Sequence, residues 1–116
     1  WDLMPTFEEL LNPKAAVKEM DGVSMLPLLE NRKGQKEHEY LYFEFQELNG
    51  RQAVRKGVWK LVHMNIRGEK PYYELYNLAA DPSEKYNLLN KYPEKVEELK
   101  AIMLEAHTDD PNWPLF

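Results

Sequence analysis

The stretch Tyr40-Leu-Tyr-Phe-Glu-Phe-Gln-Glu-Leu-Asn-Gly-Arg-Gln-Ala-Val-Arg55 decides the fold of this chain. In its first half, side chains that point to one side (Leu41, Phe43, Phe45) alternate with side chains that point to the other (Tyr42, Glu44, Gln46). Asn49-Gly50 is the strongest short hairpin signal in the sequence. The pattern predicts a strand over 40–46 and a second over 51–56, joined as a hairpin.

Two more strands are predicted downstream. Gly57 marks a tight turn into a third strand over 58–64, and the loop around Arg67-Gly68 leads to a fourth over 72–78. Short connections between successive strands predict an antiparallel meander.

Helices are predicted before and after these strands in the sequence. Pro93 begins the longest, which runs to about His107 with an apolar stripe of helical period. This helix should cover one face of the sheet and give an α+β fold. A short helix is predicted over 1–12, where Pro5 suits the first turn and Thr6 with Glu9 resembles a capping pair.

The remaining N-terminal residues predict connections. Residues 13–23 end in a turn at Asp21-Gly22, and Ser24 can cap a short apolar helical segment over 25–29. We predict one domain, 1–116, in which 1–39 is a connecting segment with short helices, 40–78 the antiparallel sheet and 93–107 the terminal helix.

The composition argues against several classes of site and partner. The chain has 116 residues, no cysteine and a net charge of −5, which argues against disulfides, thiolate metal sites and a nucleic-acid partner. No apolar run approaches the roughly 20 residues that span a bilayer. Because the chain begins at Trp1 rather than Met, we expect it to be a piece of a longer protein.

No self-contained catalytic apparatus is predicted. His38, His63 and His107 lie far apart in sequence, and none has a second ligand at a metal-binding spacing. Ser24 has no evident base partner. Phosphate-binding, dinucleotide-binding, nucleophile-elbow and EF-hand patterns are also missing from the sequence.

Polar and charged residues crowd around the first hairpin. Carboxylates, carboxamides and guanidinium groups are the set that holds hydroxyl-rich or anionic ligands. The set consists of Glu44, Gln46, Glu47, Arg51, Gln52 and Arg55. From the residues alone, a solvated edge with cross-strand Glu–Arg pairs is the favoured interpretation.

A sugar-stacking platform is a second candidate site. It would be made of the aromatic residues Trp59, Tyr72, Tyr73 and Tyr76. Core packing is the favoured interpretation, since aromatic side chains at alternating strand positions are more often buried.

Several stretches, in their order and spacing, resemble the C-terminal region of sulfatases that use a formylglycine nucleophile, in the alkaline-phosphatase-like superfamily. They are Asp2-Leu-Met-Pro-Thr-Phe7, Asp21-Gly-Val-Ser-Met-Leu-Pro-Leu-Leu29, Leu41-Tyr-Phe-Glu-Phe45, Gln52-Ala-Val-Arg55, Trp59-Lys-Leu-Val62, Glu74-Leu-Tyr-Asn-Leu78, Asp81-Pro-Ser-Glu84, Asn87-Leu88 and Pro93-Glu-Lys-Val96.

The resemblance implies a sulfuric ester hydrolase as the parent, with this subdomain packed against an N-terminal catalytic domain. Calcium and the formylglycine are implied for that parent, and a sulfated sugar or aryl sulfate as its substrate. No nucleophile or metal ligand transfers to this sequence, so the fragment alone should be inactive. Export to the periplasm or the cell exterior is common in such families.

The resemblance also strengthens the hairpin as a wall of the substrate pocket. Relatives often carry His-Glu where this chain has Gln46-Glu47, which implies a different preferred sulfated group. Two alternatives stay open: a glycan-binding module without catalysis, and the same subdomain in a phosphonate or phosphate ester hydrolase. An orphaned interface should leave apolar side chains exposed, as at Trp1, Leu3, Trp113 and Phe116.

Overall fold

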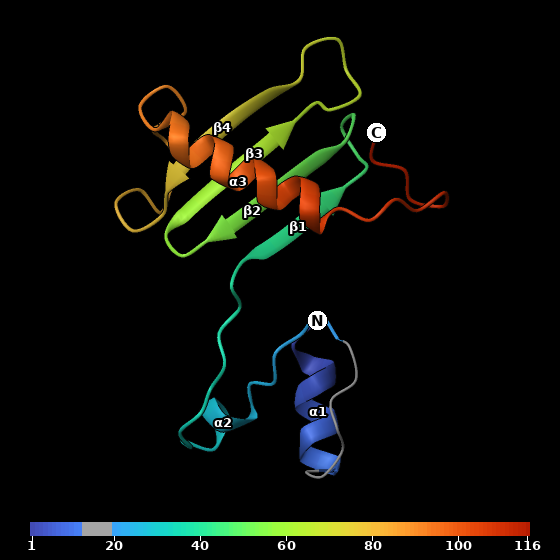
Figure 1. Ribbon diagram of the computed structural model, residues 1–116, viewed down its shortest axis with the longest axis vertical. Helices are drawn as coiled ribbons and strands as arrows, with labels where there is room; N and C mark the ends of the chain where they lie inside the picture. The colour runs from blue at the N-terminus through green and yellow to red at the C-terminus, as the bar shows by residue number, and fades with distance from the viewer. Residues whose placement is uncertain (13–19) are drawn as a thin grey trace. The chain divides into compact units, whose positions relative to one another are not determined.

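The computed structural model describes residues 1–12 and 20–116 (Figure 1). Contacts divide the chain into two compact units, Trp1–His38 and Glu39–Phe116. The first unit and the predicted connecting segment 1–39 thus differ by one residue, while the assignment of 1–116 to a single domain stays a prediction. Most of the predicted connection 13–23 lies outside the described residues.

The first unit contains helices α1 (Leu3–Leu11) and α2 (Leu26–Leu29). The predicted capping pair is wrong, because α1 begins at Leu3 and Thr6 lies inside it. The buried Thr6 hydroxyl donates to the Asp2 carbonyl (2.6 Å) and accepts from the Met25 amide (2.9 Å). Thr6 therefore ties the segment before α2 to α1. Ser24 Oγ accepts from the Leu26 amide (3.2 Å), but the N-cap residue of α2 is Met25, so Ser24 lies one position before the cap that was predicted for it.

The second unit contains a four-stranded sheet in the order β1 (Leu41–Phe45), β2 (Arg51–Lys56), β3 (Trp59–Met64) and β4 (Tyr72–Asn77). Every neighbouring pair is antiparallel, so the predicted meander is confirmed, with strand ends within one residue of the expected ones. Residues that are paired across neighbouring strands point to the same face of the sheet, and successive residues along a strand point to opposite faces. The two faces of this sheet therefore carry different sets of side chains.

Helix α3 (Pro93–Ala106) lies across one face of the sheet, as Figure 1 shows. Val54, Leu61 and Leu75 are cross-strand neighbours in the register and are fully buried under it. The helix contributes side chains at the predicted spacing, so sheet and helix share one core. The core consists of Val54, Leu61, Leu75, Val96, Leu99, Ile102 and Met103.

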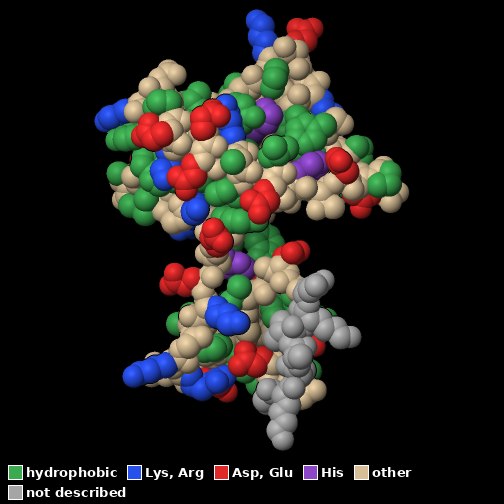
Figure 2. All heavy atoms as spheres, viewed as in Figure 1, with side chains coloured by type: hydrophobic (Ala, Val, Ile, Leu, Met, Phe, Trp, Pro, Cys, Tyr) green, Lys and Arg blue, Asp and Glu red, His purple; other side chains and the backbone are tan. Residues whose placement is uncertain are grey.

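The outer side of α3 is charged. Lys95 pairs with Glu98 (2.5 Å), and Lys100 with Glu97 (3.0 Å). Figure 2 shows Lys, Arg, Asp and Glu side chains interspersed over this side of the second unit. A mixed-charge surface of this kind is typical of a face in water.

The opposite face, which we call the open face, is apolar. Its apolar side chains are those of Leu41, Phe43, Phe45, Ala53, Val62, Met64 and Tyr72, and the register places Arg51, Arg55, Lys60, Glu74 and Tyr76 on the same face. Phe45 is 52% exposed and Tyr72 48% exposed. Within the second unit, helix α3 packs on the other side, so this face lacks a helical cover.

The segment after β4 is organised by two side chains of the sequence motif 81–88. Asp81 Oδ2 accepts from the amides of Lys85 (2.7 Å) and Tyr86 (2.8 Å). Asn87 Oδ1 accepts from the amides of Leu75 (3.1 Å) and Leu89 (3.0 Å). The motif therefore returns the chain to the sheet edge before α3 begins.

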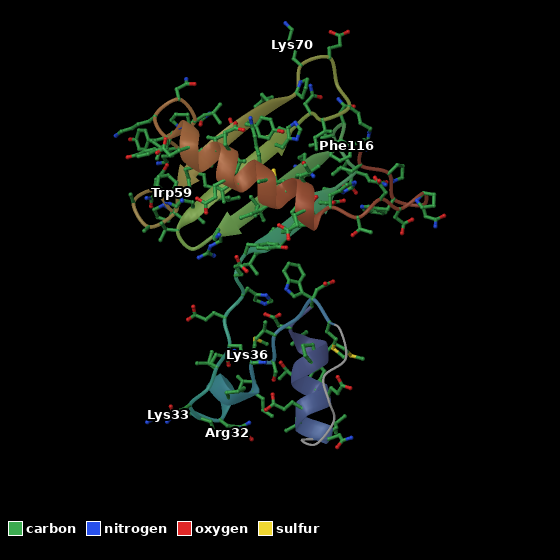
Figure 3. All side chains as sticks on the ribbon, viewed as in Figure 1. Arg32, Lys33, Lys36, Trp59, Lys70 and Phe116 are labelled. Atoms are coloured by element: carbon green, nitrogen blue, oxygen red, sulfur yellow. The ribbon has the colours of Figure 1, made fainter. Side chains whose placement is uncertain are left out.

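The four aromatic residues of the predicted platform do not share a face. Trp59 and Tyr73 lie on the helix-covered side and pack against the core, and Trp59 meets the Tyr92 ring at 5.0 Å (Figure 3). Tyr72 and Tyr76 lie on the open face. Tyr76 is nevertheless buried, so the core interpretation holds for Trp59, Tyr73 and Tyr76, and a four-ring platform is excluded.

The exposed apolar residues expected from the sequence are found. Trp1, Leu3, Trp113 and Phe116 are each about half exposed or more. The first two belong to the first unit and the last two to the second. Leu115, by contrast, is buried within the second unit.

Substitutions on the buried and exposed sides of α3 should differ sharply in their effect on the free energy of unfolding. Leu99→Ala should lower the free energy of unfolding by about 2–5 kcal/mol, because it leaves a cavity under the helix. Leu104→Ala, on the exposed side of the same helix, should change it by less than about 0.5 kcal/mol. Urea denaturation of both variants measures the difference, and equal losses would contradict the assigned core.

Candidate functional site

The structure distributes the six predicted hairpin residues over three places. Glu44 and Gln52 are directly paired across β1 and β2 on the helix-covered side. Arg51 and Arg55 lie on the open face. Gln46 and Glu47 belong to the segment 46–50 that joins the two strands, which we call the hairpin loop.

Glu44 and Gln52 belong to a hydrogen-bond network at the edge of the core. Gln52 Nε2 donates to the Tyr42 hydroxyl (2.7 Å), and that hydroxyl donates to the Glu44 carboxylate. His107 Nδ1 lies 2.6 Å from the same carboxylate, and His63 Nδ1 lies 3.3 Å from Gln52 Oε1. Glu44 therefore pairs with a histidine, whereas the solvated-edge interpretation expected an arginine.

This network shifts three pKa values. Hydrogen bonding to Glu44 raises the pKa of His107, and Asp109, 3.0 Å from His107 Nε2, adds to the effect. Burial raises the pKa of the Tyr42 phenol, and the Glu44 carboxylate raises it further. Burial lowers the pKa of His63, and the nearby Lys100 ammonium acts in the same direction. The two histidines therefore favour opposite protonation states.

Arg51 on the open face contacts an aromatic ring. Its guanidinium carbon lies 5.7 Å from the centroid of the Phe45 ring, within the range of a cation–π interaction. Its Nε is buried and has no hydrogen-bond partner among the described residues. A groove of about 420 Å³ runs beside it, lined by Phe43, Phe45, Arg51, Gln52, Ala53, Lys60, Val62 and Met64.

Lys60 projects onto the same face but is neutralised locally. Its Nζ lies 2.7 Å and 2.8 Å from the two carboxylate oxygens of Glu84, which belongs to the segment after β4. Arg55 is held by a single bond from its Nε to the Gly57 carbonyl (3.2 Å). Arg51 and Arg55 therefore have donors left for a partner that covers this face.

Sequence reasoning missed two parts of this site, Arg67 and the C-terminal segment 108–116, which we call the tail. The Arg67 guanidinium donates to the carbonyls of Gln46 (2.6 Å), Pro114 (2.9 Å) and Leu115 (3.1 Å). Phe116 lies at the same end of the sheet (Figure 3), with its ring centroid 4.9 Å from that of His107. No local sequence pattern signals these contacts, since they join residues 21 to 48 positions apart.

Metal binding finds no support in the described residues. Within 1–12 and 20–116, no three His, Asp or Glu side chains gather in a way that could hold an ion. A calcium site of the implied kind does not fit the residues that the structure describes. No described helix is long and apolar enough to cross a membrane.

Comparison with known proteins identifies the family of the chain. Residues 1–109 match the family described as N-sulphoglucosamine sulphohydrolase, C-terminal. The chain belongs to this family. It is a sulfatase C-terminal domain, and the resemblance inferred from the sequence is confirmed.

Two similar proteins show how much of a sulfatase the chain covers. An N-acetylgalactosamine-6-O-sulfatase of Bacteroides thetaiotaomicron is 33% identical over 78 residues, which cover 58% of this chain and 15% of that protein. A solved 2-O GAG sulfatase superimposes with a TM-score of 0.73 at 29% identity, over 90% of this chain and 23% of that one. The chain thus spans less than a quarter of the length of either relative.

A hydrolase with a different name shares the fold of this chain. A phosphonate monoester hydrolase of Agrobacterium radiobacter superimposes with a TM-score of 0.55 at 22% identity, over 88% of this chain and 24% of that one. The sulfatase C-terminal domain and this hydrolase therefore share a fold.

The two histidines predict opposite pH dependence of stability. The His107–Glu44 pair should stabilise the fold fully below the unfolded-state pKa of about 6.5 and lose this effect as pH rises through the raised folded-state pKa. Neutral, buried His63 should stabilise the fold above about pH 6.5 and lose its effect as pH falls.

Denaturation between pH 5.5 and pH 9 tests this. His107→Gln should destabilise the protein more at the acidic end, and His63→Gln more at the alkaline end. Parallel pH profiles for the two variants would contradict the assigned environments.

Proposed function

We propose that the parent of this sulfatase C-terminal domain hydrolyses a sulfate ester on a sugar. The match of residues 1–109 to a sulfatase C-terminal family carries the proposal. The relatives act, by their names, on an N-acetylgalactosamine 6-O-sulfate and on a 2-O-sulfated GAG, so a sulfated glycan is the substrate class with most support. The formylglycine nucleophile and calcium would belong to the N-terminal catalytic domain of the parent.

The first role we assign to this domain is support of the catalytic domain through the open face. Phe43, Phe45 and Tyr72 are exposed there, whereas the outer side of α3 is charged. A contiguous apolar face rimmed by cations is typical of a surface that another protein part covers. Arg51 and Arg55 would then donate to acidic or carbonyl groups of the catalytic domain.

The second role is to shape the substrate pocket at the hairpin loop. Glu47 is exposed, and the half-buried Gln46 uses its Nε2 for the Pro114 carbonyl, so the Glu47 carboxylate and the Gln46 Oε1 can accept hydrogen bonds from a sugar. Glu44 and Gln52 are already bonded inside the domain and would act by holding the ends of β1 and β2 in register. The fragment by itself, without nucleophile and metal ligands, is proposed to be inactive.

Enzyme assays separate the reaction classes. The full-length parent should release sulfate from 6-O- or 2-O-sulfated amino sugars at least 100-fold faster than it cleaves phenyl phosphonate, and the 116-residue chain should release none. A parent that prefers the phosphonate would overturn the sulfatase assignment. Glycan affinity in the isolated chain, equal to that of the parent, would favour a binding module.

Substitution in the hairpin loop tests the pocket role. Glu47→Ala in the parent should raise KM for the sulfated sugar by about 2- to 10-fold, the loss of one hydrogen bond, with little change in kcat. Glu94→Ala removes an exposed carboxylate from α3 and serves as the matched control. Indistinguishable KM values for the two variants and the unmodified parent would count against the loop as a pocket wall.

A further inference from the structure

The hairpin loop 46–50 is held from the side by the segment that follows β3. The Arg67 amide donates to the Asn49 carbonyl (2.8 Å), and the Ile66 amide donates to the Gly50 carbonyl (3.2 Å). Asn49 Nδ2 also donates to Asn65 Oδ1 (2.8 Å). These bonds extend the β2–β3 pairing beyond its last ladder pair, Arg51 with Met64, into the loop.

The Arg67 side chain adds a second attachment. Its Nη2 donates to the Gln46 carbonyl at the start of the loop, and its Nη1 donates to the Pro114 and Leu115 carbonyls of the tail. A planar guanidinium can serve three carbonyls at once in a fixed geometry, which a lysine ammonium on a flexible stem cannot reproduce. Arg67 thus joins three segments: the loop, the β3–β4 connection and the tail.

The tail also contacts the hairpin loop directly. Gln46 Nε2 donates to the Pro114 carbonyl (3.2 Å), and the Leu115 side chain is buried. At Gly50, a Cβ would lie 3.3 Å from the Leu115 carbonyl and 3.4 Å from Arg67 Nη1, and the residue has φ +82°. A side chain at this position would therefore be both crowded and strained.

The loop backbone needs such restraint. Leu48 has φ 53° and Asn49 has φ 64°, in the left-handed region, which asparagine tolerates and which is unfavourable for a bulky residue such as leucine. A leucine in this region persists only where the surroundings hold it. The bonds from Arg67 to Gln46 and Asn49 lie on both sides of the strained Leu48.

We propose that Arg67 is a positioning residue for substrate recognition: it fixes the backbone of the hairpin loop so that Gln46 and Glu47 face the substrate pocket. The inference rests on the proposed role of the loop as a pocket wall. Arg67 itself bonds backbone carbonyls, so it acts through the loop and the tail rather than on the sugar.

Amide hydrogen exchange in the 116-residue chain tests the positioning step without any enzyme activity. Arg67→Met keeps much of the side-chain length but removes all guanidinium bonds, and it should speed exchange by at least tenfold at the amides of Gly50 and Ile66, which donate to carbonyls of the loop. The matched control is Arg55→Met, which removes one bond to a backbone carbonyl on the open face. Exchange at the core residue Leu61 should be unchanged in both variants, which shows that they are folded.

The parent enzyme tests the link to substrate. Arg67→Met should raise KM for the sulfated sugar at least as much as Glu47→Ala, with kcat within about threefold, and Arg67→Lys should not restore KM. Unchanged exchange at Gly50 and Ile66 would overturn the proposal.

Two further outcomes separate the proposals. If Glu47→Ala raises KM and Arg67→Met does not, the Arg67 inference fails while the loop stays a pocket wall. If neither variant changes KM, the pocket role of the loop fails, and the Arg67 inference fails with it.

Discussion

The packing of α3 on one face of the sheet is the interaction on which the rest of this domain depends. Leu99 and the strand residues Leu61 and Leu75 are completely buried between the two layers. Because only one face receives α3, the alternation of the strands leaves a second, mainly apolar face that no helix of the second unit covers. The asymmetry of the core is thus the origin of the surface that we assign to the catalytic domain.

The same helix also orders the polar end of the domain. Where α3 ends, His107 meets Glu44 on β1 and the ring of Phe116 in the tail. The tail continues to the Arg67 guanidinium, which holds the hairpin loop. A chain of contacts therefore leads from the hydrophobic core, through the helix C-terminus and the tail, to the loop that is proposed to meet substrate.

Strands and helix α3 could be predicted from the sequence because their signals are local. Alternating residues define β1, and Pro93 with an apolar stripe defines α3. The pairing of the hairpin could not be read in this way. A two-residue turn at Asn49-Gly50 would place Glu44 opposite Arg55, but the observed loop 46–50 places Glu44 opposite Gln52.

Other features of the site depend on distant residues. Glu44 binds His107, which is 63 positions away, and Arg67 binds carbonyls up to 48 positions away. In α1, Thr6 bonds to the Met25 amide in place of a capping role, because that amide approaches only in the folded unit. Tertiary partners of this kind decide which polar residues are bonded inside and which remain for a ligand.

Footprinting of the open face tests the central claim most directly. Hydroxyl-radical labelling of Phe45 and Tyr72 should be strong in the 116-residue chain and strongly reduced in the full-length parent, where the catalytic domain would cover them. Tyr86, which is 71% exposed, should be labelled equally in both and serves as the internal reference. Equal labelling of Phe45 and Tyr72 in the chain and the parent would contradict the assignment of the open face as the docking surface.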